Sequence, residues 1–144
     1  MKVSEIQVSY CNSSNDKVFI KSSKDAFKVA LSHWNNDVIE FQEEVKMILL
    51  NRANRVLGIH ELSKGGASGS VVDIKIVLSV ALKCHSTSIV LIHNHPSGNL
   101  KPSQADTTIT KKLKKAGEYV DLTLLDHLII SKDGFYSFND SGDL

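Results

Sequence analysis

The chain has 144 residues, of which 42% are hydrophobic and 23% charged, with a net charge of +1 and a pI of about 7.8. These values predict a single globular domain with a sizeable core, and the near-neutral charge argues against non-specific binding to nucleic acid. No apolar run approaches the length of a membrane-spanning helix and no signal-peptide core is present, so we expect a cytoplasmic protein. Its two cysteines, Cys11 and Cys84, are far apart, which favours free buried thiols over a disulfide.

The first 37 residues predict a short hairpin and a helix. Apolar residues between Val3 and Tyr10 indicate one strand and residues 18–20 a second, with the turn-forming residues 11–16 between them. The residues Ser22 to Asp25 can then cap a helix, which the polar residues 35–37 end. One face of this helix carries the apolar residues Ala26, Phe27, Ala30, Leu31 and Trp34.

A second hairpin is predicted by the apolar runs 45–50 and 55–62, which the turn residues 51–54 separate. Two adjacent glutamates, Glu43 and Glu44, lie where its first strand begins. Because side chains alternate along a strand, only one of the two carboxylates can face a site on a given side of the sheet. Taken alone, both residues are most simply explained as solvated charges at a strand edge.

Residues 63–70 contain three glycines and three serines and predict a flexible loop. They lack the Gly-Lys-Ser/Thr ending of a phosphate-binding P-loop, so we expect the loop to border a site or to receive an extended substrate. A helical pattern follows from Val72 to Lys83, and then a short β-branched run from Ser88 to Ile92 indicates a buried strand. This helix is the connection that a βαβ crossover needs.

Two histidines, His93 and His95, come directly after this buried strand. Alternation places them on the same side of the sheet, and Pro96 and Gly98 break the strand beyond them. A carboxylate, Asp106, follows eleven positions after His95. Two histidines and one carboxylate, with a fourth position left open, are typical of a catalytic zinc site.

Asp106 also has a purely structural explanation. Ser103 and Asp106 are spaced as a capping box, and a helix from Ser103 would end naturally at Gly117. Taken alone, the cap is the simpler interpretation, whereas the nearby histidines favour the metal site. Ser103 can cap the helix while Asp106 faces the metal. The lysines at 111, 112, 114 and 115 are expected to form a solvated face rather than a nucleic-acid patch.

The last quarter of the chain predicts strands at 119–125, 128–131 and 135–138, the last two joined as a hairpin by the turn 132–134. His127 is expected to be a core residue or a partner of a metal ligand rather than a ligand. The remaining histidines have no partner at metal spacing; these are His33, His60 and His85. The order of all the elements predicts an α/β fold with a mixed, curved sheet and helices on both sides.

At the level of motifs, His93, His95, Ser103 and Asp106 match the pattern of the JAMM (MPN+) metallopeptidases, which is His-x-His, seven residues, Ser, two residues, Asp. The segment His-Asn-His-Pro-Ser-Gly and the run from Leu125 to Ile130 resemble the sequences of the RadC-like branch of that family. The resemblance covers about residues 38–144 and implies the cytidine-deaminase-like fold of JAMM domains. We expect the chain to be one such domain over 1–144, without the helix-hairpin-helix domain that precedes it in longer members.

The resemblance also implies a function, which is zinc-dependent hydrolysis of a peptide or isopeptide amide in a protein or peptide substrate. His93, His95 and Asp106 would hold Zn²⁺ and the Ser103 hydroxyl would stabilise the oxyanion. Glu43 would be the general acid and base, with Glu44 as the alternative. The rival hypothesis is a non-catalytic metal-binding scaffold or accessory protein in DNA repair or processing, a label that RadC-like proteins have traditionally carried. No set of stacking aromatic residues supports direct DNA binding.

Overall fold

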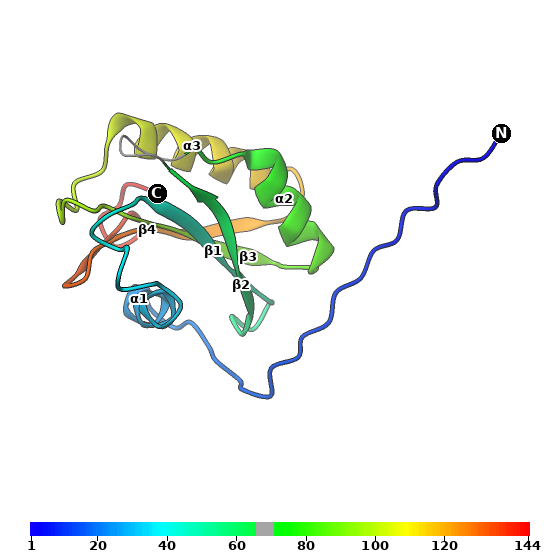
Figure 1. Cartoon of the computed structure of the whole chain (residues 1–144), viewed down its shortest axis with the longest axis horizontal. Helices are drawn as coiled ribbons and strands as arrows, with labels where there is room; N and C mark the ends of the chain where they lie inside the picture. The colour runs from blue at the N-terminus through cyan, green and yellow to red at the C-terminus, as the bar shows by residue number, and fades with distance from the viewer. Residues whose placement is uncertain (66–70) are drawn as a thin grey trace.

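A computed structural model describes residues 1–65 and 71–144 and shows one sheet with helices on both of its faces (Figure 1). The strands within these ranges form a five-stranded sheet in the order β2-β1-β3-β4-β5. β3 and β4 are parallel and all other neighbours are antiparallel. The predicted α/β fold with a mixed sheet is therefore confirmed. The elements in chain order are α1 (Ser23–Ser32), β1 (Glu44–Leu50), β2 (Val56–Lys64), α2 (Ile74–Lys83), β3 (Ser88–Asn94), α3 (Gln104–Glu118), β4 (Thr123–Ile130) and β5 (Phe135–Ser137).

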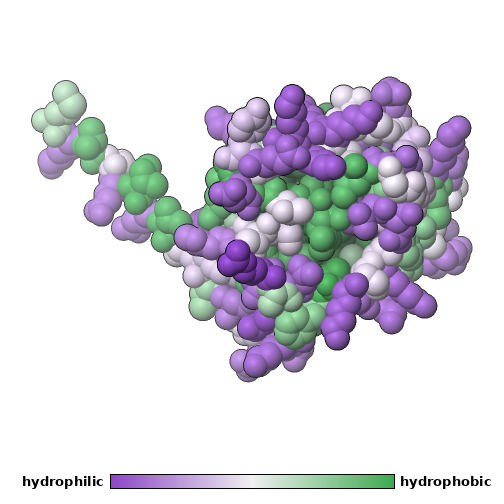
Figure 2. All heavy atoms as spheres, turned by 180° about the vertical axis from the view of Figure 1, so that it is seen from behind, coloured by the Kyte–Doolittle hydropathy of each residue, from purple (hydrophilic) through white to green (hydrophobic). Residues whose placement is uncertain are grey.

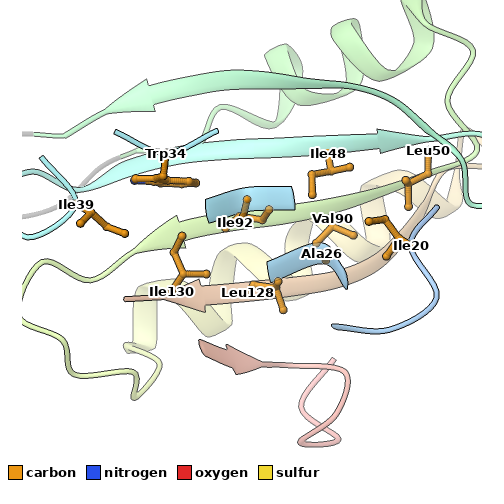
Figure 3. Close-up of a cluster of buried hydrophobic side chains, with 11 residues drawn as sticks. Ile20, Ala26, Trp34, Ile39, Ile48, Leu50, Val90, Ile92, Leu128 and Ile130 are labelled. Carbon is orange, nitrogen blue, oxygen red and sulfur yellow. The ribbon is translucent and has the colours of Figure 1, made fainter. Parts of the chain in front are cut away.

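The two faces of the sheet carry separate hydrophobic clusters. Helix α1 covers one face, where Ala26 and Trp34 pack against alternate residues of the central strands, such as Val90 and Ile92 (Figure 3). Helices α2 and α3 cover the other face, and the residues between those alternate positions pack against them. Strands β1 and β3 are buried along their whole length. This is why both are mostly apolar in the sequence, although β1 also contains the charged residues Glu44 and Lys46.

Two crossovers place α2 and α3 on the same face. β2 and β3 are both antiparallel to β1, so they run in the same direction and α2 joins them, as predicted. Helix α3 then joins β3 to its parallel neighbour β4. The carboxyl end of β3 consequently lies beside the start of α3, which is the part of the fold that carries the histidine and aspartate motif.

The predicted N-terminal hairpin is wrong. Residues 1–18 have no regular secondary structure and lead away from the body of the protein (Figure 1). Phe19 alone forms an isolated bridge, with Arg55 at the start of β2. An isolated two-stranded hairpin is marginally stable in water, and this one would have no hydrophobic face to pack on. Both cysteines are free, as expected, but Cys11 is exposed and Cys84 only half-buried.

Strand β4 replaces the two strands expected at 119–125 and 128–131, and residues 119–122 belong to the connection from α3. Leu124 pairs with Ile89 and Asp126 with Val90, which leaves Leu125 as an extra residue in β4. Such a bulge reverses the alternation of side chains beyond it. His127 therefore faces α3, as Leu124 does; in an unbroken strand it would face α1. The hairpin of β4 and β5 about residues 132–134 is confirmed.

The end of α3 shows a second correction. Gly117 lies inside the last turn, and Tyr119 is the C-cap. A Cβ atom on Gly117 would lie 2.3 Å from the backbone oxygen of Leu122. Glycine is needed there because the chain that enters β4 passes directly against the helix, and not because it stops the helix. The four lysines expected on a solvated face of α3 are all exposed.

Two further expectations concern loops and membranes. The glycine-rich loop expected at 63–70 falls largely on residues 66–70, which lie outside the described residues. Among the helices that are described, none has the length and apolar character to cross a bilayer.

Candidate metal centre

Three potential metal ligands meet where β3 ends and α3 begins. His93 is the penultimate residue of β3, His95 follows the strand, and Asp106 is in the first turn of α3. The two Nε2 atoms of the histidines are 2.9 Å apart. The carboxylate oxygens of Asp106 lie 3.2 Å from Nε2 of His93 and 3.5 Å from Nε2 of His95. The structure thus brings together the ligand set expected from the sequence, and it is the one such group in the described part of the chain.

A chain of hydrogen bonds fixes the orientation of His93. The Thr110 hydroxyl donates its single hydrogen to the backbone oxygen of Asp106 at 2.6 Å, so the same oxygen can only accept from Nδ1 of His127, also at 2.6 Å. Burial holds the pKa of His127 well below its usual range, so this ring is neutral and its Nε2 is an acceptor. His93 Nδ1 must then donate to His127 Nε2 at 2.9 Å. This leaves the lone pair of His93 Nε2 directed at His95 and Asp106.

His95 is oriented by the loop that follows it. Its Nδ1 lies 2.5 Å from the carbonyl oxygen of Asn99, which can only accept. The proton of the neutral ring therefore resides on Nδ1, and Nε2 carries the lone pair. Gly98 closes this loop with a φ of 77°, a conformation that favours glycine, and its N–H donates to the carbonyl oxygen of His95.

The donor set fits a divalent cation. In their neutral forms both histidines present a lone pair, and these two lone pairs and a carboxylate face one another with no hydrogen between them. Around zinc, bond lengths of about 2.0–2.1 Å place tetrahedral ligand atoms about 3.3 Å apart, close to the separations found here. Three protein ligands also leave a fourth position open. Residues of this kind and spacing suit zinc better than magnesium or calcium, which prefer oxygen ligands.

Asp106 serves the helix cap and the ligand group together. Its Oδ2 accepts from the backbone N–H of Ser103 at 2.7 Å, while its own N–H donates to the Ser103 hydroxyl at 3.1 Å. Burial alone would raise the pKa of Asp106, but the hydrogen bonds that His93 and His95 donate through Nε2 when they are protonated, and their positive charge, hold that pKa far below its usual range. The carboxylate is therefore ionised at neutral pH. The exposed Ser103 hydroxyl accepts in the cap and keeps its own hydrogen for another partner.

The two adjacent glutamates point to opposite faces of the sheet. Glu43 lines a cavity together with His93 and Asp106. Glu44 is only 2% exposed and faces α1, where its carboxylate lies 3.6 Å from Nζ of Lys46 and 3.7 Å from Nζ of Lys64. The geometry thus places Glu43 on the side of the ligand group and gives Glu44 a structural ion pair.

Asn94, between the two histidines, is a functional candidate that sequence reasoning missed. It is fully buried on the opposite face of β3. Its side chain accepts from the N–H of Glu44 at 2.7 Å and donates to the carbonyl oxygens of Ile39 and Gln42 at 2.7 and 2.9 Å. Asn94 therefore fixes the segment that carries Glu43. The sequence contained a signal for this role. Strand alternation points the middle residue of His-x-His into the core, and a buried amide there needs polar partners.

Two cavities flank the ligand group. One, of about 260 Å³, has Glu43, His93, Asp106 and His127 on its polar side, and its apolar walls are Val45, Val71, Val72, Ala105 and Ile109. The other, of about 280 Å³, lies beyond His95 and is bounded by the turn 131–134 between β4 and β5.

Comparison with known proteins shows which sequences this chain resembles. A family model of the RadC-like JAB domain matches residues 20–143. A UPF0758 protein of Flavobacterium johnsoniae is 46% identical over 129 residues, which are 85% of this chain and 52% of that protein. A UPF0758 protein of Clostridium beijerinckii is 36% identical over 89% of this chain and 55% of that protein. A UPF0758 protein of Thermotoga maritima is 37% identical over 72% of this chain and 46% of that protein. The chain spans about half the length of the curated relatives it matches.

Proposed function

This chain belongs to the RadC-like JAB domain family, and we propose that it is a zinc-dependent hydrolase of peptide or isopeptide amide bonds. The observation that carries the proposal is the convergence of two histidine lone pairs and one carboxylate at the end of β3. A cavity and a second carboxylate, Glu43, lie on the same side of the sheet. A group of three protein ligands supports the proposal, because a catalytic zinc site keeps a fourth position open whereas a structural site has four protein ligands.

His93, His95 and Asp106 would hold the ion. A bound zinc ion supplies a Lewis acid and lowers the pKa of a water ligand toward about 7. His127 and Asn99 bind the Nδ1 atoms of the two imidazoles, which turns both Nε2 atoms toward Asp106. Asp106 contributes the negative charge, and its cap with Ser103 fixes the carboxylate against the start of α3.

Glu43 would accept the proton of the attacking water and deliver it to the leaving amine. Glu44 is a poor candidate for this role because it is committed to Lys46 and Lys64 on the other face. The Ser103 hydroxyl, whose hydrogen is not used in the cap, would donate to the oxygen of the scissile carbonyl. The largely apolar walls of the 260 Å³ cavity favour a substrate with an apolar side chain next to the scissile bond.

The test begins with zinc content and continues with turnover on peptide libraries and lysine-linked isopeptides. We expect one zinc ion per chain and its loss in His95→Ala. Glu43→Gln should keep zinc and lose turnover, since an amide cannot accept the proton. The matched control is Glu118→Gln, which removes an exposed carboxylate at the far end of α3 and should change neither property.

The outcomes separate the hydrolase from its rival. A protein that binds no zinc would refute the metal centre. Stoichiometric zinc with no turnover on any amide, or with turnover that Glu43→Gln leaves intact, would favour a metal-binding scaffold, the alternative that includes an accessory role in DNA repair. Ser103→Ala should lower turnover on the order of 10²–10³-fold with zinc retained if its hydroxyl stabilises the oxyanion.

A further inference from the structure

The N-terminal segment, residues 3–10, exposes an unusual amount of apolar surface. Val3, Ile6 and Val8 are 85%, 84% and 70% exposed. In Figure 2, hydrophobic residues alternate with polar ones along a tail that stands clear of the body. From Ile6 to Tyr10 every second residue is apolar, which is the pattern of a strand with one face to bury.

The segment leaves the body close to the start of β2. The backbone of residues 18–20 pairs with residues 54–56, through the Ile20 N–H to Asn54 and the Val56 N–H to Val18. The side chains of Tyr10 and Asn12 both donate to the backbone oxygen of Leu57 at 3.3 Å. These contacts hold the segment at β2, but before Tyr10 the chain points away from its own sheet (Figure 1).

β2 provides a matching surface because it is an edge strand. In the sheet order it has β1 on one side, and the isolated bridge at Arg55 is the one strand-like pairing on its other side among the described residues. From Gly58 to Lys64 this edge therefore has no strand partner within residues 1–65 and 71–144. Open edges of this length readily pair with another strand unless something covers them. The chain thus carries both an open edge and an unpaired segment with strand alternation.

We propose that residues 3–10 add as a strand to the β2 edge of a second copy of this chain, so that two copies exchange their N-terminal segments. Each copy then covers one edge and buries Ile6 and Val8, which removes both exposed features at once. Exchange of identical elements closes a two-fold dimer without new complementary surface. The direction of the segment, away from its own β2, supports a second copy over the segment's own sheet.

The test uses the full chain, by light scattering after size exclusion and by amide hydrogen exchange. We expect a dimer with slow exchange at residues 4–10 and 58–64. Ile6→Lys with Val8→Lys should weaken dimerisation by at least about 100-fold, because each copy loses two buried side chains. Gln7→Lys with Ser9→Lys, which adds the same charge to the other face of the segment, should leave the dimer intact. Both variants change exposed residues outside the core, so both should remain folded, and circular dichroism checks that they are.

A monomeric protein would overturn the proposal, whether its N-terminal segment exchanges fast or is protected on its own β2. A dimer that survives Ile6→Lys with Val8→Lys would place the interface elsewhere and also overturn it. Dissociation by Gln7→Lys with Ser9→Lys alone would show that the buried face is not the apolar one. None of these outcomes depends on zinc or hydrolysis.

Discussion

Thr110→Val tests the hydrogen-bond chain that orients His93. The substitution keeps the shape of the side chain and removes the hydroxyl that accepts from Nδ1 of His127. His127 is 1% exposed, so an Nδ1–H without an acceptor would be costly there, and the ring would move its proton to Nε2. That nitrogen would then donate to His93 Nδ1 and force the proton of His93 onto Nε2, the atom that faces the metal.

The expected cost is a loss of zinc affinity of about 10–100-fold, equal to about 1.4–2.7 kcal/mol, which is typical of the partners that orient metal-binding histidines. Competition with a chromophoric chelator measures the affinity, and proton–nitrogen NMR correlations of the imidazole rings report the tautomer of His93 in the metal-free protein. Thr108→Val is the matched control, because Thr108 is an exposed residue of the same helix whose hydroxyl also donates to the carbonyl four residues back. Thr110→Ser, which restores a hydroxyl, should recover most of the affinity.

Zinc binding by Thr110→Val as tight as that of Thr108→Val, with the proton of His93 still on Nδ1, would contradict this role of Thr110. Zinc binding by Thr110→Ser as weak as that of Thr110→Val would also contradict it, since the shape of the side chain and not its hydroxyl would then matter. Thermal unfolding of all three variants separates a local effect on the ligands from a general loss of stability.

Three further predictions follow from buried contacts. Glu44→Gln should retain zinc but cost about 1–3 kcal/mol of unfolding free energy, measured in urea, because Lys46 loses a buried partner; an unchanged stability would contradict the ion pair. Zinc affinity should fall as pH falls through the pKa of His95, because the proton on His95 must leave before zinc binds. The hydrogen bond between His95 and Asp106 raises that pKa. Calorimetry in buffers of different ionisation enthalpy should detect the released proton, and the absence of proton release would count against His95 as a ligand. Gly117→Ala should lower the melting temperature through overlap with Leu122, at a cost of about 1–3 kcal/mol, and a neutral effect would mean that the connection to β4 gives way.

Much of the fold follows from local signals in the sequence. Ser22 caps α1, the mostly apolar runs that become β1 and β3 are buried on both faces, and α2 makes the crossover from β2 to β3. The two histidines lie on one side because strand alternation is a local property. Each of these predictions depends on residues a few positions apart, so no knowledge of the tertiary structure was required.

The predictions that failed depend on distant partners. The apolar residues 3–10 have strand alternation, but alternation does not say which sheet they join, and in the structure they join none. The bulge at Leu125 is set by the pairing of β4 with β3 and cannot be seen in the sequence of β4 alone. Thr110 looked like an ordinary helix residue, because its partner His127 is brought to it by that bulge.

The three residues His93, Asn94 and His95 show how one strand end serves the whole candidate site. The outer two send their imidazoles toward α3, where Asp106 completes the ligand group. Asn94 points the other way and binds the backbone from Ile39 to Glu44. Since the segment it holds also carries Glu43, the position of the proposed base and the position of the ligands depend on the same three peptide units. Asn94 therefore helps to position the candidate site, as the two histidines do. A substitution of Asn94 should displace Glu43 more than it displaces the metal ligands.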